Sequence, residues 1–141
     1  MLPQRTRPAG NYLPAFRRDT LLFISGQFPV LDGTLRYTGQ VGHDLSVAQG
    51  REAAELAALN ALAHIRAETD NWRQFRALVR VDGHINSADG WFEQPAVLDG
   101  ASDLFRNVLG EQAGHARTVL SYSQLPLNAA IELVVIAAIK S

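Results

Sequence analysis

The pattern of apolar and polar positions along the chain predicts six strands and two helices. Short apolar runs, several of them bounded by glycine or proline, are typical of strands. The predicted strands lie at residues 12–16, 21–25, 35–38, 77–85, 117–123 and 131–139. Pro14 would confine the first of them to a sheet edge or a bulge, and Gly83 predicts a bulge in the fourth. Strands and helices in one short chain predict a domain of the α/β or α+β class.

Two longer segments have the spacing of amphipathic helices. The first covers residues 47–68, where leucine and isoleucine recur at helical spacing with many alanines between them. Ser46 precedes this segment and Gln49 follows three residues later, which predicts a capping box. The second covers residues 95–109, begins with a proline that suits a first turn, and is expected to end at Gly110. Because alanine faces permit close approach, the first helix is expected to lie flat on a sheet.

The final predicted strand, residues 131–139, is apolar on both faces apart from Glu132. A strand that is apolar on both faces is normally covered on both faces. Two helices can cover only one side of a small sheet, so the other side needs a partner. We therefore expect a homo-oligomer in which the sheets of neighbouring copies pack together.

The composition narrows the class of protein further. With 141 residues, 47% of them hydrophobic, the chain fits a single domain over residues 1–141, whose residues 1–9 are expected to form a loose arm. The formal net charge of −1 provides no field that would attract nucleic acid or an anionic membrane. There are no cysteines, and no secretory signal or membrane-spanning run is found, so we expect a cytoplasmic protein without disulfides.

Two charged side chains within predicted strands are candidates for chemistry. Glu132 is the one carboxylate in an otherwise apolar strand, and burial of a carboxylate is costly and raises its pKa unless the group is paired. The alternative is a structural ion pair or a strand end that reaches solvent. Arg117 opens its strand after a polar loop, where a guanidinium could bind a carboxylate through two hydrogen bonds. The alternative there is a solvated strand end.

The spacing of these two residues bears on where they could meet. If the last two strands formed a hairpin that turns near Pro126, Arg117 would pair near Ile136. Glu132 would then lie roughly 13 Å away along the strand. The two could share a site only if another strand intervenes or a neighbouring subunit contributes one of them, which favours a site at an interface.

Other candidate residues carry weaker signals. The four histidines lack the spacing of a zinc site, so no metal is expected. Ser25 lacks the Gly-x-Ser-x-Gly surroundings of a nucleophile, but it could donate a hydrogen bond in a pocket.

Four sequence elements occur together in a characteristic order. They are Gly10-Asn11-Tyr12 followed by Ser25-Gly26-Gln27, the capped helix with Ala58-Leu59-Asn60, Ala116-Arg117-Thr118, and Leu125-Pro126 followed by Ile131-Glu132. On these elements the chain resembles the RidA/YjgF family, also described as YER057c/UK114-like proteins. The resemblance implies a chorismate-mutase-like mixed sheet with two helices on one face, assembled as a trimeric barrel with clefts between subunits.

The resemblance also implies an activity. Members of this family hydrolyse reactive enamines and 2-imino acids to 2-keto acids and ammonia without a metal or cofactor. By position, Arg117 would bind the carboxylate of the substrate, and Glu132 would hold and polarise the attacking water. Tyr12, Ser25 and Gly26 would line the pocket. Two alternatives remain: a non-catalytic module that binds a small carboxylate, and an endoribonuclease, which the near-neutral charge disfavours.

The chain also departs from the usual pattern of the family. Asn11 and His115 stand where proline is common, and Val119 stands where a cysteine is often found. Gly100 aligns without gaps with a pocket asparagine, and the segment 82–100 is long. These departures indicate a longer, divergent subgroup and leave the identity of the substrate open.

Overall fold

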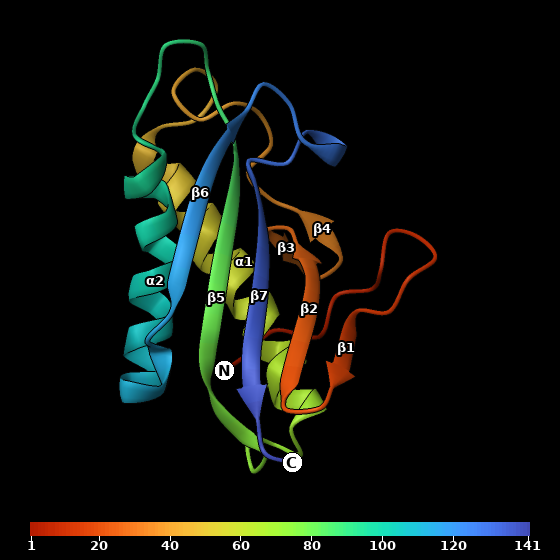
Figure 1. The fold of residues 1–141 in the computed structure, drawn as a ribbon. Coiled ribbons are helices and arrows are strands. Elements are labelled where there is room, and N and C mark those ends of the chain that lie inside the picture. Colours follow the sequence, from red (N-terminus) through yellow and green to blue (C-terminus); the bar gives the residue numbers. More distant parts are fainter.

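The computed structural model describes residues 1–141, and a five-stranded sheet with two helices on one face forms its centre (Figure 1). The strands lie in the spatial order β1 (Ala15–Arg18), β2 (Leu21–Gln27), β7 (Ile131–Ile139), β5 (Phe75–Asn86) and β6 (Ala116–Tyr122). β5 and β6 are parallel, and every other neighbouring pair in this sheet is antiparallel. Strands β3 (Val30–Leu31) and β4 (Thr34–Leu35) form a separate small hairpin. The predicted mixed sheet with two helices on one face is confirmed.

Helix α1 (Val47–Glu68) has the predicted bounds. The Ser46 hydroxyl accepts a hydrogen bond from the backbone N–H of Gln49 at 3.1 Å, and the Gln49 side chain accepts one from the backbone N–H of Ser46 at 2.9 Å. This reciprocal pair satisfies two N–H groups that the first helical turn leaves free. The alanine face of α1 is fully buried, so the helix lies flat on the sheet, mainly against β7 and β2 (Figure 1).

Helix α2 (Gln94–Leu109) runs beside β6 and packs closely against α1 (Figure 1). The short 3-10 helix η1 (Gly110–Ala113) follows it, and Gly110 ends α2 with a positive φ of 60°. Gly100 lies at the contact between the two helices. A Cβ atom on Gly100 would overlap the carbonyl oxygen of Arg51 and lie 3.0 Å from its Cα, so the missing side chain sets the helix separation.

Three details of the predicted strands are wrong, each for a local reason. The first strand begins at Ala15, because Pro14 has no N–H for the ladder. The third is reduced to Thr34–Leu35 within the small hairpin, because Tyr37 has a left-handed φ of 57° that ends the extended backbone. The irregularities of β5 lie in its first half, whereas Gly83 is regularly paired and leaves room for the side chain of Leu98.

The sheet face opposite the helices, called the open face below, has no cover within the chain. Alternate residues of β7 point to the helices and are fully buried, and the residues between them are only partly buried. Exposed apolar side chains continue across this face from the other strands, with Phe16, Phe23 and Leu120 showing 44%, 39% and 48% of their surface. This continuous apolar surface is the surface that the predicted partner copy would cover. Neither α1 nor α2 combines the length and the hydrophobicity that a membrane-spanning helix requires.

A buried histidine on α1 connects the N-terminal segment to the sheet. Thr6 donates a hydrogen bond to the Gln27 amide oxygen at 2.6 Å, so its hydroxyl oxygen is free to accept from Nε2 of His64 at 2.9 Å. The other ring nitrogen, Nδ1, is buried and has no partner. Burial, aided by the charge of Arg5, lowers the pKa of His64 below its ordinary value of 6.5.

This histidine predicts a loss of stability in mild acid. As the pH falls below the ordinary pKa, the unfolded chain binds a proton on His64 before the folded chain does. The free energy of unfolding should therefore fall by up to about 1.4 kcal/mol per pH unit until the lowered pKa of the folded state is reached. Urea titrations over this window should show that His64→Gln removes this component of the slope, while His43→Gln, at an exposed position, keeps it. An unchanged slope in His64→Gln would contradict this assignment.

Candidate functional site

Three of the residues predicted for the site line one small cavity. Tyr12, Ser25 and Gly26 surround a space of about 100 Å³ under the segment of residues 6–12. The Ser25 hydroxyl donates to the carbonyl of Leu13 at 2.6 Å, and the Tyr12 hydroxyl accepts from the backbone N–H of Ala9 at 3.1 Å. The N-terminal segment therefore closes the cavity from one side.

Glu132 lies next to this cavity, against Gly26, although it is not one of the residues that line it. It lies on β7, next to β2, and its carboxylate occupies the space where a side chain of residue 26 would be. Gly26 is therefore required for the carboxylate to lie there. The carboxylate oxygens make no hydrogen bond or ion pair within the chain, so they remain free to accept one from a water or a ligand. Tyr12, Ser25, Gly26 and Glu132 are called the Glu132 half-site below.

Arg117 lies elsewhere, at the start of β6 and on the helix side of the sheet. Its Nη1 atom forms an ion pair with Asp99 at 2.8 Å and donates to the Ser102 hydroxyl at 3.1 Å. Its Nη2 atom points to the carbonyl of Pro95 at 3.4 Å. The guanidinium is therefore held by α2, with 28% of the side chain exposed to solvent.

His115 extends this group of polar side chains. Its Nε2 atom lies 3.0 Å from the Ser102 hydroxyl, and its Nδ1 atom contacts the carbonyl of Ala113, so Nδ1 carries the proton and Nε2 accepts from Ser102. These residues form one wall of an open, mostly polar cavity of about 410 Å³. Asp99, Ser102, His115 and Arg117 are called the Arg117 half-site below.

Sequence reasoning missed the partners of Arg117 on α2. Asp99 and Ser102 are three residues apart, so they lie on one face of the helix, and this spacing was the available signal. Their pairing with a strand that begins only at Ala116 depends on how α2 packs on the sheet. That packing could not be read from the local sequence.

The structure keeps the two half-sites apart within one chain. β5 lies between β6 and β7, so the hairpin considered above does not form. Arg117 is level with Val81 and Val135, and Glu132 is three positions further along β7, roughly 10 Å away along the strand. The two side chains also point to opposite faces of the sheet, because the residues level with Arg117 are buried under the helices. A single chain therefore does not bring Arg117 to Glu132.

No three histidine, aspartate or glutamate side chains gather in a way that could hold a metal ion. The chemistry available at the two half-sites is instead hydrogen bonding and charge. One half-site carries a fixed cation, and the other carries an unpaired carboxylate next to a small cavity.

The fold is that of an α+β protein in which a mixed sheet carries two helices on one face, and the two half-sites lie on opposite faces of this sheet. Residues 1–139 match the family described as "YjgF/chorismate mutase-like, putative endoribonuclease". The chain belongs to this family, in agreement with the resemblance in its sequence.

Similar proteins span most of the chain. Protein TCP17 of Trypanosoma cruzi is 36% identical over 133 residues, which are 94% of this chain and 83% of that protein. The crystal structure of Atu1372 from Agrobacterium tumefaciens, a protein of unknown function, has a TM-score of 0.90 at 38% identity and covers 94% and 85% of the two chains. A structure from Shewanella oneidensis, described as a putative endoribonuclease, has a TM-score of 0.95 at 36% identity and covers 98% and 91%.

Proposed function

We propose that this protein hydrolyses small 2-imino acids to 2-keto acids and ammonia in clefts between three copies of the chain. The observation that carries the proposal is the unpaired Glu132 carboxylate, held over Gly26 beside a cavity that Ser25 and Tyr12 line. A carboxylate in this position can accept a hydrogen bond from a water and orient it for attack.

The reaction needs little from the protein beyond position and charge. The carbon of a protonated imine is already electrophilic. Catalysis therefore requires mainly that the protein position the attacking water and the substrate. The water oxygen bonds to this carbon while Glu132 takes a proton. Glu132 then passes this proton to the nitrogen, and as the C–N bond breaks and ammonia leaves, the carboxylate takes the hydroxyl proton and the carbonyl forms.

Arg117 would fix the substrate by its carboxylate. A guanidinium binds a carboxylate through two parallel hydrogen bonds, and here the substrate would take the place that Asp99 now holds at 2.8 Å. The E. coli TdcF structure, which has the same fold at 17% identity and a TM-score of 0.67, contains bound serine, a small carboxylate.

The proposal requires an assembly of copies, because one chain keeps the half-sites apart. Covering the open face with neighbouring copies would bury Phe16, Phe23 and Leu120, which are exposed in the single chain. In such an assembly the Arg117 half-site of one subunit could face the Glu132 half-site of the next.

The proposal predicts faster ammonia release when the imine is made in situ by an amino-acid oxidase or a threonine dehydratase. Gly26→Ala should abolish this acceleration, because the new methyl group would displace the Glu132 carboxylate. Its thermal unfolding should change little, since a flexible side chain can move aside.

Gly33→Ala, between β3 and β4 and outside both half-sites, is the control and should keep full activity, because a Cβ there meets no atom within 4 Å. Its positive φ of 75° should lower only the unfolding temperature. No acceleration by the native protein, with imines from several parent amino acids, would refute the proposed function.

The ion pair between Arg117 and Asp99 supports one alternative, a module that binds a small carboxylate without turning it over. Both functions predict that 2-keto acids raise the unfolding temperature, since a ligand that binds the folded state stabilises it. Stabilisation without any acceleration of ammonia release would favour the binding module.

A further inference from the structure

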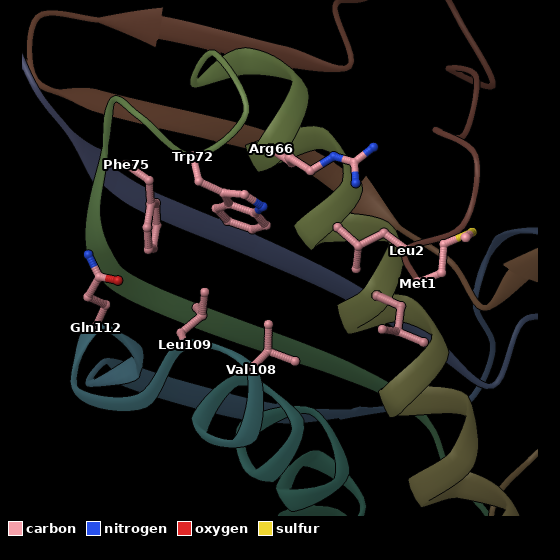
Figure 2. A pocket seen from close by; sticks show the side chains of 9 residues that line it. Met1, Leu2, Arg66, Trp72, Phe75, Val108, Leu109 and Gln112 are labelled. Atoms are coloured by element: carbon pink, nitrogen blue, oxygen red, sulfur yellow. The ribbon is translucent and has the colours of Figure 1, made fainter.

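A third cavity lies on the helix side of the molecule, away from both half-sites. It has a volume of about 460 Å³ and lies between the C-terminal ends of α1 and α2, under the turn that leads into β5. Figure 2 shows Trp72 and Arg66 along one edge of the cavity and Val108 and Leu109 along the opposite edge. Its lining is apolar apart from Arg66 and Gln112, and it shares no residue with either half-site.

The turn that carries Trp72 has an unusual backbone. Asp70, Asn71 and Trp72 are three consecutive residues with positive φ, at 51°, 55° and 75°. Aspartate and asparagine tolerate this left-handed region, but a bulky tryptophan rarely adopts it. Such strain persists only where the surroundings enforce it, and it gathers at ligand sites. The turn therefore holds the indole ring at the cavity in spite of its backbone preference.

Contacts on both sides of the turn fix this conformation. The N–H of Asn71 donates to the carbonyl of Arg66 at 3.0 Å, and the N–H of Gln74 donates to the carbonyl of Thr69 at 2.9 Å. The ring of Trp72 packs edge to face on Phe75, with centroids 5.5 Å apart. The wall of the cavity is thus already formed without a ligand.

Two hydrogen-bond donors at this cavity have no partner within the chain. The guanidinium of Arg66 forms no ion pair within the chain, and the nearby Asp70 pairs with Arg73 at 3.2 Å. The indole N–H of Trp72 makes no hydrogen bond, and in Figure 2 its nitrogen lies at the end of the ring that faces Leu2. An apolar cavity with a free cation and a free N–H donor at its edge matches an anion that has an apolar body.

We infer that this cavity binds a monocarboxylate with an extended apolar chain. The carboxylate accepts hydrogen bonds from Arg66 and Trp72, and the chain lies between Leu59 and Val108. The volume falls within the usual range of small-molecule sites. An amine of the same length would meet the charge of Arg66, and an alcohol would lose the ionic contact. The inference does not depend on the proposed activity, because no residue of the half-sites takes part.

The test uses the two tryptophans of the chain as internal reporters. Octanoate is titrated into ¹⁵N-labelled protein, and the indole N–H resonances of Trp72 and Trp91 are followed, with Trp91→Phe to assign them. The Trp72 resonance should shift and saturate while the Trp91 resonance stays in place. Butanoate should bind at least about tenfold more weakly, because it buries fewer methylene groups. Octylamine should not bind in the concentration range over which octanoate saturates the site.

Variants decide whether Arg66 recognises the carboxylate. Arg66→Gln should weaken octanoate binding about five- to tenfold, as expected for the loss of a charge-assisted hydrogen bond at an exposed position. Arg36→Gln removes the same charge from an exposed site outside the cavity and should bind octanoate as the native protein does. An unmoved Trp72 resonance, equal binding of octylamine, or unchanged affinity in Arg66→Gln would each overturn the inference.

Discussion

Arg117→Ala is expected to lower the kcat/KM for 2-imino acid hydrolysis by about 100- to 1,000-fold. Losing a paired, charge-assisted contact to a substrate carboxylate costs about 3–4 kcal/mol, and each 1.4 kcal/mol corresponds to about tenfold in rate. The fold should survive, because the ion pair with Asp99 is partly exposed and its loss costs little. Coupled ammonia release and the unfolding temperature, measured on the same preparations, separate these two effects.

Arg36→Ala removes a positive charge from an exposed position outside both half-sites, and it should retain native activity. Its comparison with Arg117→Ala distinguishes a specific contact from a change in overall charge. Native kcat/KM in Arg117→Ala would rule out a role for this guanidinium in substrate binding.

Gly100→Ala is expected to cause the largest loss of stability among single methyl additions. The new Cβ would overlap the carbonyl oxygen of Arg51, which belongs to the backbone of α1 and cannot rotate away. Overpacking of this kind costs roughly 3 kcal/mol, and the better helix propensity of alanine returns about 1 kcal/mol. A net loss of about 2 kcal/mol should appear as a lower unfolding temperature at a fixed protein concentration.

Gly50→Ala, within α1, should lose less stability than Gly100→Ala. A Cβ there approaches only side-chain methyl groups of Val97 and Val41, at 2.9 and 3.1 Å, so a smaller loss is expected. If Gly100→Ala were as stable as the native protein, the two helices could separate more easily than their contact implies.

Local signals explain which parts of the fold could be predicted from the sequence. The capping box at Ser46 and the leucine spacing behind it define α1 to the residue, and the apolar run of β7 is equally clear. The pairing of β5 with β6 in parallel joins segments more than thirty residues apart, with α2 between them. That pairing depends on packing, and no local pattern specifies it.

The residues of the candidate sites also fall into those that the sequence identifies and those that only the packing reveals. Glu132 stands out as the one carboxylate of an apolar strand, and Arg117 opens a strand within the Ala116-Arg117-Thr118 element, so both could be selected from the sequence. The partners Asp99 and Ser102 could not, because their side of α2 has the polar pattern of an ordinary solvated face. The cavity at Trp72 was also missed, since the left-handed turn before it contains no glycine to mark it.

Each site should combine Arg117 of one subunit with Glu132 of another, and mixing two inactive variants tests this arrangement. Arg117→Ala and Glu132→Gln are unfolded together in equal amounts, refolded, and assayed for ammonia release. In a randomly mixed trimer about one cleft in four contains both native residues, so about a quarter of native activity should return. Mixed trimers that form but remain as inactive as either parent would contradict the claim.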